Sequence, residues 1–211
     1  MSTRARVSAE RPVGDVDWRR HDAPALTPLL EAALDAFYES GFHGTSVRDI
    51  ARRVGQTVPA LYYHHDSKEG VLLALVAGGI RDLLWRVEAA ASDGGDDVRR
   101  RFENVVEAIT LHGTRRVRAA ALDAESRYLS AENRAQYAAL RKQVETVLAE
   151  IVDDGVASGV FRASHPGETT RAILGMLQSI TRWYRTDGPD TPEEIAARYV
   201  DICLRVVGVD P

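Results

Sequence analysis

The stretch that most constrains the fold is residues 44–65, which has room for two short helices with one tight turn between them. Ser46 and Asp49 have the spacing of a capping box, in which two side chains satisfy backbone N–H groups at a helix start. Thr45 is the competing cap. Gly55 directly follows the first helix and can take the left-handed conformation that ends a helix.

Both short helices have an apolar side that needs a core. In the first, residues at spacings of three and four form the predicted buried face, namely Val47, Ile50, Ala51 and Val54. In the second, Thr57 suits the N-cap, Pro59 fits the first turn, and Leu61 is the natural core contact.

A support helix is predicted just before this pair. Thr27 can cap it, Pro28 suits its first position, and Gly41 ends it. Its apolar face consists of Leu29, Leu30, Ala33, Leu34, Phe37 and Tyr38. The three helices lie within residues 25–70 and match the helix-turn-helix plan, in which the second helix of the pair enters the major groove of DNA.

The remainder, residues 71–211, is predicted to form a body of six further helices. These are expected to begin at about Ser67, Asp97, Ala119, Glu132, Pro166 and Thr191. No strand-like alternation of useful length occurs, so the predicted fold class is all-α with about nine helices. Residues 1–24 mix arginines with acids, which predicts a flexible tail; a basic arm along the DNA backbone or minor groove is the alternative.

Composition argues against several other classes of protein. The 211 residues carry a net charge of -4, so bulk attraction to nucleic acid is not expected, although a few cations can anchor a local DNA site. No apolar run approaches the ~20 residues that span a bilayer, and the first residues lack the apolar core of a secretory signal. Cys203 is the single cysteine, so no intrachain disulfide can form. We therefore predict a cytoplasmic protein without membrane contact.

The sequence contains none of the common catalytic or metal-binding motifs. It has no nucleophile elbow, no glycine-rich nucleotide loop, no His-Glu-x-x-His and no paired cysteines. Its acidic pairs stand at expected helix ends or loops and are typical of caps. We predict neither an enzyme nor a bound cofactor or metal.

The dense part of the helix-turn-helix pattern runs from Leu29 to Leu75 without gaps. It comprises Thr45–Ala51, Gly55, Leu61–His64 and Ser67–Glu69. On these residues the sequence resembles the TetR family of bacterial transcriptional regulators. The resemblance implies a homodimer whose subunits each have a three-helix DNA-binding head and a six-helix body that binds a small ligand.

The positions that match the family imply two groups of DNA contacts. Phosphate oxygens are the expected partners of four side chains, Tyr62, Tyr63, His64 and Lys68. Contacts to thymine methyl groups suit the small side chains that begin the recognition helix, Thr57, Val58, Pro59 and Ala60. Arg48, supported by Ser46, is the candidate for a guanine or phosphate contact.

Two positions depart from the family pattern. His65 stands where a large aromatic usually packs the head onto the fourth helix, so we expect it to pack there as a neutral side chain or else to face solvent. Val58 stands where a lysine is common, so the expected set has one phosphate or base contact fewer.

The C-terminal half resembles one branch of the family in Glu125–Leu129, Gly175–Arg185, Asp187–Pro189 and Pro192–Ala196. That branch controls lipid, fatty-acid or steroid catabolism, and some of its members respond to acyl-CoA thioesters. The resemblance implies a repressor that binds a palindromic operator as a homodimer and is released by a small hydrophobic or acyl-CoA-type effector. An activator or dual regulator is the alternative within the family, and a helical protein-binding adaptor is the alternative outside it.

An effector pocket is expected among the fourth to eighth helices. Its candidate lining is Trp85, Phe102, Ile109, His112, Tyr128, Tyr137, Met176, Trp183 and Tyr184. Packing in the core is the competing interpretation of each. The arginines at 115, 116 and 118 could meet a phosphate or carboxylate, or else form a solvated helix end.

The last two helices are implied to form a four-helix interface in the dimer. The candidate residues are Ile173, Gly175, Leu177, Ile180, Tyr184, Ile195, Tyr199, Ile202 and Val206. The glycine would let a partner helix approach closely, whereas the apolar stripes could also belong to the chain's own core.

Overall fold

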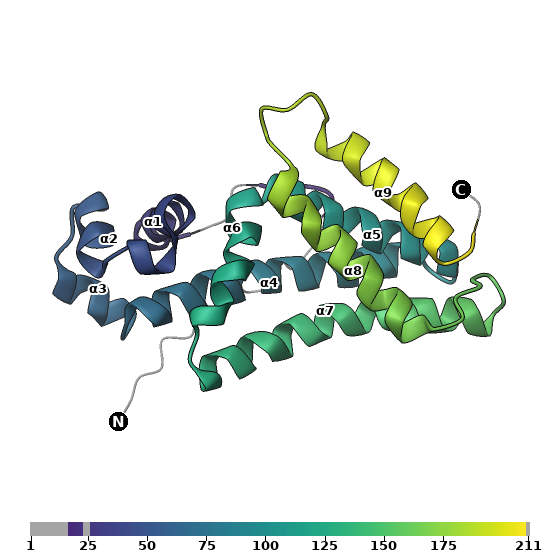
Figure 1. The fold of residues 1–211 in the computed structure, drawn as a ribbon, viewed down its shortest axis with the longest axis horizontal. Helices are drawn as coiled ribbons and strands as arrows, with labels where there is room; N and C mark the ends of the chain where they lie inside the picture. The colour runs from purple at the N-terminus through teal and green to yellow at the C-terminus, as the bar shows by residue number, and fades with distance from the viewer. Residues whose placement is uncertain (1–16, 23–25, 210–211) are drawn as a thin grey trace.

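The computed structural model describes residues 17–22 and 26–209, and within them it contains nine α-helices, one 3₁₀ helix and no strand. The elements are α1 (Pro28–Gly44), α2 (Val47–Arg53), α3 (Val58–His64), α4 (Lys68–Asp93), α5 (Val98–Arg115), α6 (Val117–Ala121), η1 (Leu122–Tyr128), α7 (Ala131–Ala157), α8 (Pro166–Trp183) and α9 (Pro192–Val206). Figure 1 shows α1, α2 and α3 grouped at one end, with α4 leading from them into the body. The predicted all-α fold is confirmed.

The helix starts follow the caps that the sequence indicates. A side-chain oxygen accepts a first-turn backbone N–H at Thr27, Ser46, Thr57, Ser67 and Thr191. Thr45 is not a cap, because its buried hydroxyl donates to the carbonyl oxygens of Ala36 and Gly41, each at 2.9 Å. Gly55 has a φ of +66° in the turn between α2 and α3, a conformation that glycine adopts without strain.

The head is packed directly onto the body. Leu61 of α3 is fully buried in a core that α1, α2 and the first turns of α4 also line. The same core includes Leu122, Leu129 and Tyr137, which lie in or beside η1 and in α7. α4 therefore belongs to both parts, and the domain boundary predicted at residue 70 falls in its first turn.

The core of the body gathers around α5, which packs against α4, α7, α8 and α9. Phe102 of α5 meets Phe161 edge-on, with 5.2 Å between ring centroids. Gly155 makes room for this pair, since a Cβ there would come within 2.0 Å of the Phe161 ring. Among the helices of the described ranges, none combines the length and apolar character needed to cross a bilayer.

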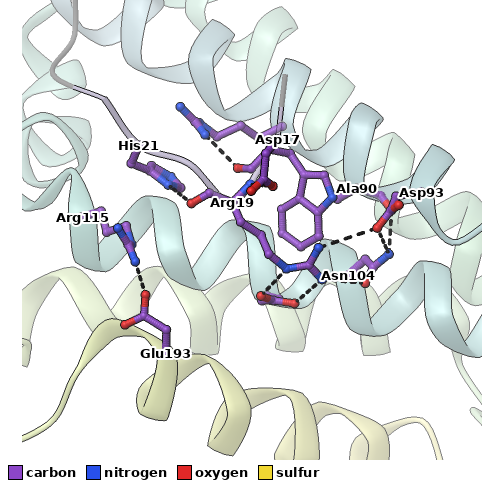
Figure 2. Close-up of polar contacts among 11 residues, drawn as sticks. Asp17, Arg19, His21, Ala90, Asp93, Asn104, Arg115 and Glu193 are labelled. Carbon is purple, nitrogen blue, oxygen red and sulfur yellow. Dashed lines mark hydrogen bonds and ion pairs between the residues drawn. The ribbon is translucent and has the colours of Figure 1, made fainter. Parts of the chain in front are cut away.

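Residues 17–22, called the strap below, lie against the body (Figure 2). Trp18 in the strap is only 4% exposed and belongs to the core of the body. The prediction of a flexible tail is therefore wrong for the strap, because burying an indole removes a large apolar area from water. The other predicted tail residues, 1–16 and 23–24, lie outside the described part of the chain.

Candidate DNA-binding head and buried polar site

Arg48 is the exposed cation of the helix-turn-helix with the fewest ties to the protein. Its side chain makes no hydrogen bond or ion pair with the residues that the structure describes. The next two arginines are already paired, Arg52 with Asp49 at 2.8 Å and Arg53 with Glu39 at 2.6 Å. Arg48 can therefore turn to a base or a phosphate without first breaking a bond within the described chain.

Ser46 acts mainly at the start of α2. Its hydroxyl accepts the backbone N–H of Asp49 at 3.2 Å and donates to the carboxylate of the same residue at 2.6 Å. The Asp49 carboxylate in turn accepts the Ser46 backbone N–H at 3.1 Å, which completes the predicted capping box. Ser46 supports Arg48 by fixing the helix turn that carries it.

The start of α3 presents small side chains. Thr57 and Pro59 are exposed, whereas Val58 and Ala60 are half-buried. The Thr57 hydroxyl accepts the Ala60 N–H at 3.4 Å and so holds the first turn of the helix. These short side chains suit apolar contacts with base methyl groups, and their contact with DNA stays a prediction.

The end of α3 divides its residues between core and surface. Leu61 is fully buried, while Tyr62 and Tyr63 are 44% and 86% exposed, as the turn of about 100° per residue requires. The side chain of His64 lies outside what the structure describes. His65 is half-buried and ends α3, with its backbone N–H donating to the carbonyl of Leu61 at 3.0 Å, so it is neither fully packed nor fully exposed.

Lys68 makes contacts within the protein that the sequence does not predict. Its ammonium donates to the carbonyl oxygens of Phe42 at 2.7 Å and Thr45 at 2.8 Å, and it lies 4.2 Å from the Phe42 ring centroid. Two of its three N–H groups thus fasten the start of α4 to the end of α1. Burial lowers the pKa of Lys68. A phosphate contact through the third N–H stays a prediction.

Tyr128 lies at the junction of head and body, and its place in an effector pocket stays a prediction. Its ring stacks on Phe42 with 5.7 Å between centroids and meets His43 edge-on at 4.3 Å. The Glu125 carboxylate accepts the backbone N–H of Phe42 at 2.7 Å beside this stack. These contacts hold η1 against the end of α1.

A buried polar group lies in the body around Asp82 of α4 and is called the Asp82 cluster below. The Asp82 carboxylate accepts the Trp85 indole N–H at 3.0 Å and two guanidinium contacts from Arg86 at 3.2 and 3.3 Å. His112 Nδ1 of α5 and Arg116 Nε lie 3.5 and 3.6 Å from the same carboxylate. Burial raises the pKa of Asp82, but His112 and Arg86 outweigh it and hold the pKa well below its usual range.

Three buried nitrogen atoms beside this carboxylate make no hydrogen bond within the described chain. They are His112 Nδ1, Arg116 Nε and, in the strap, His21 Nε2. The 3.5 Å between His112 and Asp82 is an ion-pair distance rather than a good hydrogen bond. Burial lowers the pKa of His21 to about 4, so this ring is neutral at pH 7. The His21 Nδ1–H donates to the Arg19 carbonyl at 3.0 Å, so the Nε2 of this neutral ring is an acceptor. Arg116 Nε–H is the unpaired donor of the site and suits an acceptor oxygen of a ligand.

Sequence reasoning finds only part of this cluster. Of the predicted pocket residues, Trp85 and His112 meet there, whereas Asp82 and Arg86 were missed. Their spacing of four residues within the apolar stripe of the fourth helix is a signal for a buried ion pair. His21 could not be found in this way, because the strap has no periodic pattern.

The other predicted pocket residues are spread over three places. Phe102 and Tyr184 are buried in the core of the body, with Ile109 and Met176 packed against it. The Tyr137 hydroxyl donates to Asp123 at 2.5 Å within the core shared with the head. Trp183 is 47% exposed and stacks on Tyr199, and its place in a pocket stays a prediction.

The predicted dimer residues fall into two sets. The side chains enclosed in the chain's own core are Ile173, Leu177, Ile180, Tyr184 and Ile195, so the prediction that they face a partner is wrong. The others remain available on the outside of α8 and α9, namely Gly175, Tyr199, Ile202 and Val206. The apolar stripe exists, but most of it faces inward.

The three arginines near the end of α5 have separate partners inside the chain. Arg115 pairs with Glu193 of α9 (Figure 2), and Arg118 pairs with Asp35 of α1. Arg116 donates to the backbone carbonyl of Asp22 in the strap. They therefore do not act as one basic group.

Comparison with known proteins agrees with this geometry. The family described as "Bacterial regulatory proteins, tetR family" matches residues 29–75, and "Tetracyclin repressor-like, C-terminal domain" matches residues 95–207. The chain belongs to the TetR family. This TetR-family chain is therefore a DNA-binding transcriptional regulator, and α1–α3 are its helix-turn-helix head.

Individual relatives of this TetR-family chain cover most of its length. The HTH-type transcriptional repressor KstR2 of Rhodococcus jostii is 30% identical over 184 residues, which are 84% of this chain and 88% of the relative. The ketosteroid regulator KstR2 of Mycobacterium tuberculosis superposes with a TM-score of 0.76 at 27% identity, covering 84% and 91% of the two chains. AibR, crystallised with isovaleryl coenzyme A and operator DNA, gives 0.75 at 27% identity, covering 82% and 95%.

Proposed function

We propose that this chain is a cytoplasmic transcriptional repressor that binds a palindromic operator as a homodimer and leaves it when a small hydrophobic or acyl-CoA-type effector binds the body. The observation that carries the proposal is the outer face of α2 and α3. There Arg48 is exposed without a partner among the described residues, and Tyr63 is 86% exposed. The relative in Rhodococcus jostii that is named a repressor supports the direction of control.

The Asp82 cluster supports an effector site in the body. An acyl-CoA thioester combines an apolar chain with carbonyl and phosphate oxygens, which match an apolar core beside the unpaired Arg116 Nε–H donor. The AibR structure holds isovaleryl coenzyme A, and KstR2 is named as a ketosteroid regulator, so both kinds of ligand are candidates here.

α4 connects the proposed effector site to the DNA-binding head. Lys68 fastens its start to α1, and Asp82 lies about 21 Å further along the helix at 1.5 Å per residue. A dimer must hold its recognition helices about 34 Å apart to enter successive major grooves. An effector that binds better when α4 is displaced therefore lowers the population that fits the operator.

The outside of α8 and α9 supports the homodimer. Trp183 is 47%, Val206 42% and Ile202 38% exposed, and Tyr199 stacks on the tryptophan. A Cβ added at Gly175 would meet nothing within 4 Å, so a partner helix could approach closely there. A paired Ile202→Glu and Val206→Glu change should convert the dimer to a monomer in sedimentation equilibrium, and a wild-type monomer at micromolar concentration would contradict the proposal.

The DNA-binding part is tested with duplexes selected from a random library by the purified protein. We expect an enriched palindrome that binds with about 10³-fold or greater preference over scrambled duplex at about 0.15 M salt. Recovery of no preferred sequence would contradict the proposal.

The effector part is tested by titrating isovaleryl coenzyme A, longer acyl-CoA thioesters and free coenzyme A into the protein–operator complex. We expect at least one thioester to weaken operator binding about 5- to 150-fold while free coenzyme A does not. A thioester that binds the body but leaves operator affinity unchanged is not the effector.

A further inference from the structure

The strap is part of the body rather than an appendage to it. Trp18 is 4% exposed and shares the core that α4 and α5 line. The Arg19 guanidinium lies 3.8 Å from the centroid of the Trp18 ring and closes over it from outside. The strap therefore fills a place in the core that would otherwise be open to solvent.

α4 depends on the strap for a buried charge. The Arg86 guanidinium, whose residue is only 3% exposed, donates to the backbone carbonyls of Trp18 and Arg20, each at 2.8 Å. Its other described partners are the Asp82 carboxylate and the Trp85 ring, whose centroid lies 4.5 Å from the guanidinium. A buried guanidinium that loses two carbonyl acceptors is strongly disfavoured, so α4 at Arg86 and the strap hold each other in place.

The strap also ties α4 to α5. Arg19 makes a two-pronged contact with the Glu107 carboxylate of α5, at 2.8 and 2.9 Å, and its guanidinium lies 3.6 Å from Asp93 at the end of α4. The Asn104 amide of α5 accepts from Arg19 at 3.3 Å and donates to the Ala90 carbonyl at 3.1 Å (Figure 2). These contacts restrain any sliding of α4 along α5.

The strap is close in the chain to the first helix of the head. Only residues 23–25 separate Asp22 from Leu26, and the α1 cap, Thr27, follows at once. At about 3.8 Å per Cα–Cα step, Leu26 can lie no further than about 15 Å from Asp22. The strap thus restrains the head from the α1 side, while α4 restrains it from the other.

We propose that the docked strap fixes the position of the DNA-binding head on the body and so sets the half-site spacing that the dimer accepts. The proposal rests on the proposed function, because half-site spacing exists only for a dimer on an operator. Trp18, Arg19 and Arg86 are positioning residues that act through α4 and α1 and do not touch DNA. Release of the strap leaves the reading surface of α2 and α3 intact but frees the angle of the head.

The test uses full-length variants. Trp18→Ala removes the buried anchor, and Arg19→Glu repels Glu107 and Asp93 without making a core cavity. Val144→Ala is the control, since it makes a cavity in the same core from α7, outside the strap contacts described above. Strap release is read by trypsin cleavage after Arg20, and coupling is read by hydrogen exchange in α4 and the first turn of α1.

DNA recognition is then measured with the selected operator and with the same operator carrying one inserted central base pair. We expect both strap variants to be cleaved faster, to exchange faster in α4 and α1, and to lose about fivefold or more of the wild-type discrimination between the two duplexes. The control should keep that discrimination. A merely structural role would weaken binding to both duplexes equally and leave their ratio unchanged.

Three results would overturn the proposal. The first is a variant whose strap is released but whose hydrogen-exchange rates in α4 and α1 equal those of the wild type. This result can be obtained without DNA. The second is an unchanged ratio between the two duplexes, and the third is the same loss in Val144→Ala. A wild-type protein that prefers no duplex counts against the proposed function instead, and the exchange measurement still decides whether the strap is coupled to the head.

Discussion

The head and the Asp82 cluster use polar residues in opposite ways. In the head, Ser46 and Thr57 cap helices at the surface, and Arg48 is exposed. In the body, the Arg86 guanidinium is buried beneath the strap and pairs with the half-buried Asp82 carboxylate. Water can replace a lost partner in the first case but not in the second, so the head can change its contacts at little cost in stability and the body cannot.

The largest effect is expected from Arg86→Ala, which removes the two guanidinium contacts of Asp82 and leaves two strap carbonyls without their donor. We expect a loss of about 3–5 kcal/mol in the free energy of unfolding, measured by urea denaturation. Arg52→Ala is the matched control, since that exposed arginine also pairs with an aspartate on its own helix, and it should change stability by less than about 0.5 kcal/mol. Equal losses would remove the contrast between the two regions.

Arg48→Ala should give the converse result. We expect operator affinity to fall by about 1–3 kcal/mol, with relaxed preference at one base position, while urea stability stays within about 0.5 kcal/mol of wild type. Fluorescence anisotropy with single-base operator variants measures the first quantity. Arg100→Ala in the body is the control for lost charge, and a variant at Arg48 that retains both affinity and preference would exclude it from base reading.

Lys68→Met should give an intermediate effect, because the ammonium joins the start of α4 to the end of α1 and is also a predicted phosphate contact. We expect a loss of about 1–3 kcal/mol in stability from the two unpaired carbonyls. If the third N–H also meets phosphate, the slope of log affinity against log salt falls by about one. An unchanged slope would mean that Lys68 only connects α1 to α4. Lys142→Met on α7 is the control for loss of a lysine charge far from the head.

The smallest effect is expected from pH. Burial lowers the pKa of His21 to about 4 from an unfolded value near 6.5. The Arg86 guanidinium and the His112 ring also face His21 and lower its pKa further, whereas the Asp82 carboxylate opposes the shift. The docked neutral ring therefore contributes stability that is complete above about pH 6.5 and is lost as pH falls through about 4. Fluorine NMR of 5-fluorotryptophan at Trp18 should show the strap released over this range.

His21→Gln is the control for that titration, because an amide does not gain a proton. Its Trp18 resonance should change less between about pH 6.5 and 4 than that of the wild type. The same change in both proteins would show that another group drives the release.

Most of the head could be predicted from the sequence because its signals are local. A cap, a first-turn proline and a glycine at positive φ act within four residues, so the predictions for Thr27, Ser46 and Gly55 are confirmed. The prediction for Leu61 is also confirmed, since a short helix with one large apolar residue has one side to bury. The division of roles at Lys68 is not local, because its acceptors lie 23 and 26 residues away.

The body is harder to predict because an apolar stripe on a helix does not show which other surface will cover it. Ile173 and Leu177 are apolar residues at helical spacing, a pattern that fits a dimer interface and a core equally well. The structure buries both within one chain. Trp183 shows the reverse, since a residue expected inside lies outside beside Tyr199.

By itself the sequence determined that the chain is all-α, where its helices begin, and that residues 44–65 form a helix-turn-helix, because hydrogen bonds and side-chain periodicity within one or two turns set these features. The tertiary structure alone decided that Trp18 belongs to the core, that Arg86 is neutralised by Asp82 and capped by the strap, and which face of α8 stays outside. Those outcomes depend on which surfaces exclude water from one another, and that is a property of the assembled helices rather than of any one of them.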